Sequence, residues 1–73
     1  MRVSDVREIV ETAQVDSRLY SFESEQHESL CLLLFGQTWR VFISERGQRR
    51  EDHSFSTEDE ACVYFLKRIF QLP

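Results

Sequence analysis

The stretch from Leu30 to Phe35 is the feature that most constrains how this chain can fold. Its six residues, Leu-Cys-Leu-Leu-Leu-Phe, include no polar side chain. The run is too short to cross a bilayer, which takes about 20 apolar residues. In a chain of 73 residues, a run of this kind fits a strand that is buried on both faces. We therefore predict a strand over residues 29–35 at the centre of a sheet.

Three further segments have the pattern of strands. Residues 18–24 place Tyr20 and Phe22 on one face, and residues 38–44 also alternate. Residues 49–55 form either a short fourth strand or an arm. Polar turns of a few residues separate these segments, and connections this short join antiparallel neighbours. We therefore predict an antiparallel meander.

Trp39 is the only tryptophan and the largest side chain of its strand. It shares a face with Val41 and Ile43, so we expect it to lie in the core if the helices cover that face. If they cover the opposite face, which carries Arg40 and Phe42, Trp39 becomes exposed and can anchor an interface. The alternation of the strand leaves both possibilities open.

Two segments repeat apolar residues at helical spacing, one on each side of the strands. Residues 4–14 start with Ser4 as the N-cap. Two hydroxyl residues, Ser56 and Thr57, and three acids mark the start of residues 57–70, with Ser56 as the expected cap. The order is α-β-β-β-(β)-α in a single domain, residues 1–73. We predict an α+β two-layer sandwich with both helices on one face of the sheet. The predicted core residues are Ile9, Leu32, Leu34, Val41, Phe65, Leu66 and Ile69.

The size of the chain favours a binding module over an enzyme, because so small a domain buries only about 60% of its unfolded surface. No nucleophile elbow, glycine-rich phosphate loop or paired catalytic motif is present. His27 and His53 have no Cys or His at ligand spacing, and Cys31 and Cys62 lack the paired spacing of a zinc or redox site. We expect no catalytic residues, no cofactor and no metal, with reduced cysteines that act as small buried hydrophobes.

Charge is distributed unevenly along the chain. The net charge is −4, made up of −4 over residues 1–30, +3 over residues 31–50 and −3 over residues 51–73. An acidic protein repels nucleic acid and anionic membranes, and it attracts basic partners. The arginines of the basic middle block are Arg40, Arg46, Arg49 and Arg50.

A small nucleic-acid-binding or regulatory module is the alternative from another functional class. The element order is that of a double-stranded-RNA-binding domain, and the arginines of the middle block are the side chains that could hold phosphates. Such domains carry lysines at the start of the last helix, whereas residues 56–60 read Ser-Thr-Glu-Asp-Glu. These acids repel phosphates, so we do not expect nucleic acid as the partner.

The residues from Trp39 to Leu66 form a recognisable sequence pattern. They read Trp-x-Val-Phe-Ile-Ser-Glu-Arg-Gly, a polar connection, and then Phe-Ser-Thr-Glu-Asp-Glu-Ala-Cys-Val-Tyr-Phe-Leu. This pattern resembles small immunity proteins of bacterial polymorphic-toxin and contact-dependent growth-inhibition systems. The resemblance implies a protein without catalysis that binds a cognate toxin domain, often a nuclease, and blocks its active site or its access to substrate. An acidic partner suits a basic nuclease, because complementary charge speeds association.

Two acidic clusters and one aromatic residue are the candidate toxin-binding residues. The preferred cluster leads into the last helix and consists of Glu51, Asp52, Glu58, Asp59 and Glu60. The second cluster surrounds the first hairpin and consists of Glu23, Glu25 and Glu28, and the aromatic candidate is Trp39.

The sequence also carries expectations about location and assembly. No apolar stretch follows the first arginine, so we expect no secretory signal and a cytoplasmic protein. We expect no membrane contact, and a monomer or homodimer when the protein is isolated from its toxin.

Overall fold

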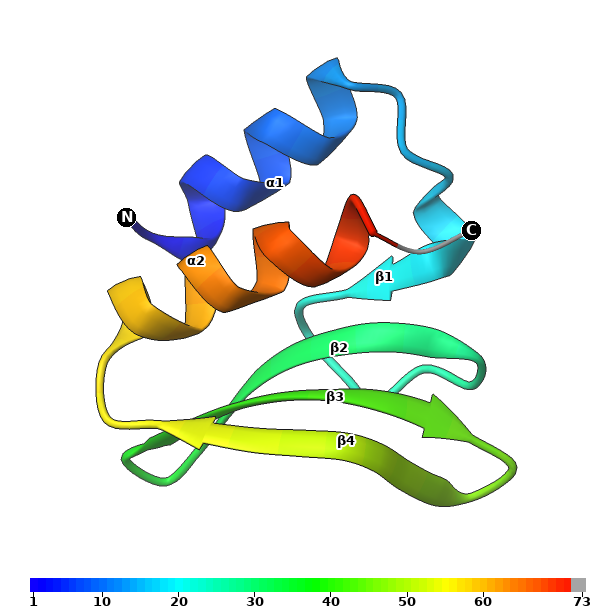
Figure 1. Ribbon diagram of the computed structural model, residues 1–73, viewed down its shortest axis with the longest axis vertical. Coiled ribbons are helices and arrows are strands. Elements are labelled where there is room, and N and C mark those ends of the chain that lie inside the picture. The colour runs from blue at the N-terminus through cyan, green and yellow to red at the C-terminus, as the bar shows by residue number, and fades with distance from the viewer. Residues whose placement is uncertain (72–73) are drawn as a thin grey trace.

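The computed structural model describes residues 1–71 and confirms the α+β class. Two helices and a four-stranded sheet follow one another in the predicted order (Figure 1). The elements are α1 (Val3–Thr12), a short 3-10 helix (Ser17–Leu19), β1 (Tyr20–Ser21), β2 (Ser29–Phe35), β3 (Thr38–Glu45), β4 (Gln48–Phe55) and α2 (Glu58–Ile69).

The sheet has the strand order β1-β2-β3-β4, so β2 lies inside it as the apolar run predicts. The β2–β3 and β3–β4 pairs are antiparallel, and residues 49–55 belong to a full fourth strand. The prediction of an entirely antiparallel meander is wrong, because β1 pairs parallel to β2 through Tyr20 with Leu30 and Ser21 with Cys31.

The parallel pairing of β1 follows from how short this strand is. β1 ends at Ser21 because Phe22 leaves the sheet, and its ring lies 5.2 Å from the ring of Phe65 in α2. Two residues of strand span only about 7 Å. The loop over residues 22–28 is therefore long enough to return the chain to the same end of the sheet and start β2 in the same direction.

Two-residue turns fix the register of β2, β3 and β4. Phe35 pairs with Thr38 across Gly36 and Gln37, and Gly36 has a φ of 64°. Between β3 and β4, Arg46 and Gly47 both have positive φ, at 51° and 76°. Positive φ at both central residues is the type I′ geometry, whose twist matches that of the flanking strands.

The two helices are capped differently at their N-terminal ends. α1 begins at Val3 rather than with Ser4 as its cap: the Arg2 N–H donates to Asp5 Oδ2 at 2.7 Å, and the Val3 N–H donates to Glu58 Oε2 at 2.8 Å. α2 is capped by Thr57 and not by Ser56 as predicted, because Thr57 Oγ1 accepts a hydrogen bond from the Glu60 N–H at 3.2 Å and the helix begins at Glu58.

Replacing the cap of α2 gives a measurable loss of stability. We expect Thr57→Ala to lower the free energy of unfolding by about 1 kcal/mol, because a backbone donor at the start of the helix loses its acceptor. Ser56→Ala is the matched control. Within residues 1–71 the Ser56 hydroxyl bonds only to the Glu60 side chain, so its loss should stay within about 0.5 kcal/mol. Urea unfolding of both variants measures the difference, and equal losses would contradict the assigned cap.

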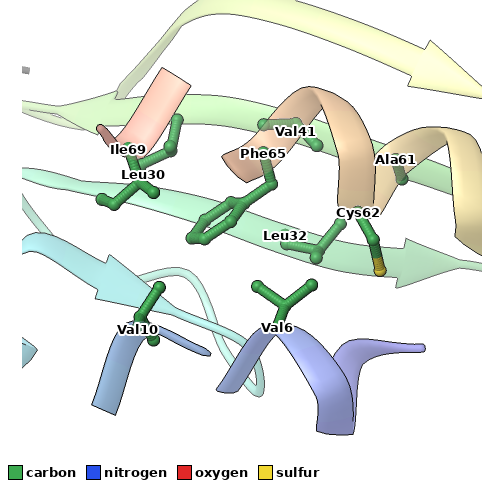
Figure 2. Packing of buried hydrophobic residues seen from close by; sticks show 9 residues of the cluster. All are labelled: Val6, Val10, Leu30, Leu32, Val41, Ala61, Cys62, Phe65 and Ile69. Atoms are coloured by element: carbon green, nitrogen blue, oxygen red, sulfur yellow. The ribbon is translucent and has the colours of Figure 1, made fainter. Parts of the chain in front are cut away.

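Both helices pack against one face of the sheet, as predicted. Val6 and Val10 of α1 point toward Phe65 of α2 and Leu32 of β2 (Figure 2). The buried residues of this core are Val6, Val10, Leu30, Leu32, Val41, Ala61, Cys62, Phe65 and Ile69.

Three of the predicted core residues lie outside this buried set. Ile9 is 38% exposed on α1, and Leu66 is only partly buried at the margin of the core. Leu34 is 51% exposed, because β1 pairs only with the first half of β2 and leaves the outer side of the second half uncovered. Leu32, Val41, Phe65 and Ile69 are buried as predicted.

Candidate protein-binding surface

Two arginines of the basic middle block, Arg40 and Arg49, lie on the sheet face that the helices do not cover. Arg49 pairs with Glu25 at 3.0 Å, and its guanidinium lies 4.8 Å from the ring centre of Phe42 and 4.9 Å from that of Phe35. Phe42 is fully buried, so this arginine covers an apolar cluster that no helix reaches. Arg40 pairs with Asp52 at 3.5 Å.

The acidic cluster around the first hairpin is divided by the fold. Glu25 accepts hydrogen bonds from Arg49 and Ser44. These bonds, with that from Arg49 the more important, hold the pKa of its carboxyl below the ordinary value. Glu23 and Glu25 line a groove beside β2, whereas Glu28 lies in a separate depression next to His27. Glu25 is therefore engaged within the protein, and the three acids do not form one contact surface.

The preferred cluster is divided as well. Glu51 binds Arg68 of α2 through both carboxylate oxygens at 2.8 Å, and Asp52 binds Arg40 on the uncovered sheet face. The other three acids of this cluster occupy the first turn of α2. The acids there are Glu58, Asp59 and Glu60.

Trp39 resolves the choice that strand alternation left open. It lies on the helix-covered face, packed against the core beside Val41 and opposite Phe55 of β4. The side chain is only partly buried. Trp39 is therefore mainly a packing residue at the margin of the core.

The first turns of the two helices bring carboxylates together. α1 and α2 lie side by side and start at the same end of the molecule (Figure 1), where Glu58 accepts from the Val3 N–H. Asp59 accepts from the Met1 amine at 2.7 Å. Both helix dipoles present their positive ends here, which stabilises carboxylates in the first turns.

Three more carboxylates stand on α1 and were not among the sequence candidates. Asp5, Glu8 and Glu11 are exposed at three-residue spacing. Their spacing on one helix was the available signal, because positions three apart lie on neighbouring turns of a helix surface. We call the six carboxylates of the two helices the acidic helix surface: Asp5, Glu8, Glu11, Glu58, Asp59 and Glu60.

Apolar side chains are exposed among these acids. A groove of about 520 Å³ runs along α1 and includes Ile9. Val63 of α2 is 42% exposed. Within residues 1–71, no lysine or arginine forms a salt bridge to a carboxylate of the acidic helix surface. The groove is lined by Asp5, Glu8, Ile9, Thr12 and Ala13.

The described chain holds neither a metal-binding cluster nor a helix able to span a membrane. Residues 1–71 contain no group of three or more His, Cys, Asp or Glu side chains that could hold a metal ion. Over the same range, neither helix has the length and apolar character needed to cross a membrane.

Cys62 is a buried thiol beneath the acidic helix surface. Burial, with a further contribution from the Glu58 carboxylate, raises the pKa of this thiol to about 11. Cys31 lies in the apolar cluster on the opposite sheet face, and both cysteines are free.

The raised pKa of Cys62 makes stability depend on pH in the alkaline range. The folded protein retains the thiol proton above the ordinary pKa of 9.0, whereas the unfolded chain releases it. We therefore expect this thiol's contribution to stability to be complete below pH 9 and to be lost as the pH rises to about 11. Urea unfolding across this range should show a steeper decline for the natural protein than for Cys62→Ala. Equal slopes would contradict the assignment.

No protein family, curated protein or solved structure matches this chain.

Proposed function

We propose that this protein is an immunity protein that binds a cognate toxin domain and blocks its active site or its access to substrate. The acidic helix surface carries the proposal, because it combines carboxylates without lysine or arginine partners with exposed apolar side chains. The toxin domain that fits such a surface is basic, and nuclease domains are basic because they hold phosphates.

The division of charge between the two sides of the molecule supports this choice of surface. On the uncovered sheet face, Arg40 and Arg49 are held by Asp52 and Glu25, so each positive charge has a local counter-charge. On the helices, Asp59 pairs with the Met1 amine, whereas the other five carboxylates of the acidic helix surface form no salt bridge within residues 1–71. A net negative surface of this kind attracts a basic partner and raises the rate of encounter.

The segment that resembles immunity proteins supports the same surface. Its residues build the frame that holds the start of α2. Gly47 forms the β3–β4 turn, and Thr57 caps the helix. The ring centre of Phe55 lies 5.3 Å from that of Tyr64. This frame places Glu58, Asp59 and Glu60 in the first turn. The exposed apolar residues beside them can supply the desolvated centre that stable interfaces need.

Growth rescue tests the proposed function. Toxin domains encoded beside this gene should be expressed in bacteria from an inducible promoter, with and without this protein. We expect growth to be restored for one of these domains, and the same cells should release a complex of the two proteins on affinity purification. The proposal is wrong if no neighbouring toxin domain is bound or neutralised.

A further inference from the structure

The outer edge of β2 is open over the second half of the strand. β1 covers β2 only where Tyr20 and Ser21 pair with Leu30 and Cys31. Beyond this point the chain of β1 leaves the sheet, and the remaining residues of β2 pair only with β3. An open edge presents backbone donors and acceptors to any extended chain that approaches it.

The register shows which backbone groups face this edge. Phe35 and Thr38 close a two-residue hairpin, so they are a hydrogen-bonded pair of the antiparallel ladder. Residues in such a ladder alternate, and Leu34 therefore directs its N–H and C=O away from β3. No turn or loop backbone group within residues 1–71 bonds to Leu34.

A groove of about 410 Å³ runs beside this edge. Leu34 is 51% exposed and Phe35 is 39% exposed, on alternate faces of the strand. Glu23 stands at the groove with its side chain 84% exposed, and within residues 1–71 its one ion pair is a 3.4 Å contact to Arg7. The residues that line the groove are Phe22, Glu23, Ser24, Glu25, Leu33, Leu34 and Phe35.

The other edge of the sheet is protected. β4 carries charged side chains at the four consecutive residues 49–52, and its pairing with β3 is interrupted by a bulge between Val41 and Ile43. Glu51, at this irregularity, has a φ of 52°. Charged side chains and bulges of this kind prevent an edge from pairing with another chain. The edge of β2 has apolar side chains in their place.

We propose that the open edge of β2 binds an extended segment of a partner protein, which adds to the sheet as a further strand beside residues 32–35. The segment carries an apolar residue that packs on Leu34 and Phe22, and a basic residue beside Glu23. A second copy of this chain fits less well, because pairing two β2 edges sets the acidic groove of one copy against that of the other. The site is separate from the acidic helix surface and does not depend on the proposed function.

Binding of a short peptide, compared with binding of the same peptide N-methylated on its backbone, tests the proposal. The probe is the acetylated, amidated hexapeptide Thr-Lys-Val-Arg-Val-Thr, added at millimolar concentration to the ¹⁵N-labelled protein. The matched control has the same side chains but carries N-methyl groups on alternate residues, which remove the hydrogen bonds of its pairing edge. We expect the unmodified peptide to slow exchange of the Leu34 amide at least fivefold and to shift the amide signals of residues 32–35. The methylated peptide should do neither.

Each other outcome overturns the proposal. Equal effects of the two peptides would mean that side chains alone bind, and shifts confined to β4 would place the site at the wrong edge. No effect of either peptide would remove the site. Protection of Leu34 that rises with protein concentration in the absence of peptide would assign the edge to a second copy.

Glu23→Lys should weaken binding of the unmodified peptide at least threefold, whereas Glu45→Lys, a matched change at the distant β3–β4 turn, should not.

Discussion

Phe65→Ala is expected to lower the free energy of unfolding by about 3–5 kcal/mol, the usual loss when a buried phenylalanine is truncated. Phe65 is fully buried and lies where both helices meet the sheet (Figure 2). Domains of this size have a total stability of only about 5–10 kcal/mol. The variant should therefore melt at least about 12 °C lower than the natural protein, or fail to fold.

Phe70→Ala is the matched control for this substitution. Phe70 follows the last turn of the same helix and is 54% exposed, so the same truncation leaves no cavity. Its cost should stay below about 1 kcal/mol. Thermal and urea unfolding of the two variants compare them directly. Similar losses at both positions would contradict a core centred on Phe65.

Charge reversal on α1 is expected to slow association with the toxin domain at least tenfold at low salt. The variant combines Glu8→Lys with Glu11→Lys, two exposed positions without hydrogen bonds to other residues of the described chain. The positive charges would repel a basic partner at the surface where it docks. Because salt screens such forces, the difference should shrink strongly between low and high ionic strength.

The control for this variant changes the same charge elsewhere. Each Glu→Lys substitution raises the net charge by two. The control variant, Glu28→Lys with Glu45→Lys, therefore has the same net charge as the α1 variant, 0 instead of −4. We expect the control to slow association less than threefold. Stopped-flow kinetics over a range of salt concentrations measure both variants. Equal effects would mean that net charge, rather than the acidic helix surface, governs encounter.

The central part of the fold could be predicted because several local signals agree there. The apolar run predicts an internal strand, the glycines predict the two tight turns, and two hydroxyl residues followed by three acids predict α2. Each signal depends on residues close together in the sequence. The structure confirms them for that reason.

The direction of β1 could not be predicted in this way. Strand alternation over residues 18–24 predicts a full strand, but Phe22 packs on Phe65 of α2 and ends β1 early. That contact joins residues far apart in the sequence. The exposure of Leu34 follows from the same event, because the shortened strand leaves part of β2 uncovered.

The candidate site was predicted in part. Charge counting along the sequence identified Glu58, Asp59 and Glu60, and the fold places them in one helical turn. Charge counting could not predict that Glu51 binds Arg68, or that Asp52 binds Arg40 on the uncovered sheet face. These ion pairs depend on strand register and helix packing. The carboxylates of α1 join the surface through the parallel packing of the two helices.

Inhibition of the purified toxin domain tests the central claim most directly. The activity of the toxin domain encoded beside this gene should be measured while this protein is added in increasing amounts. The proposed function predicts that activity falls linearly and is lost at about one equivalent, as expected when a tight complex covers the active site or the path to it. Activity that is unchanged by a large molar excess of the folded protein would contradict the claim.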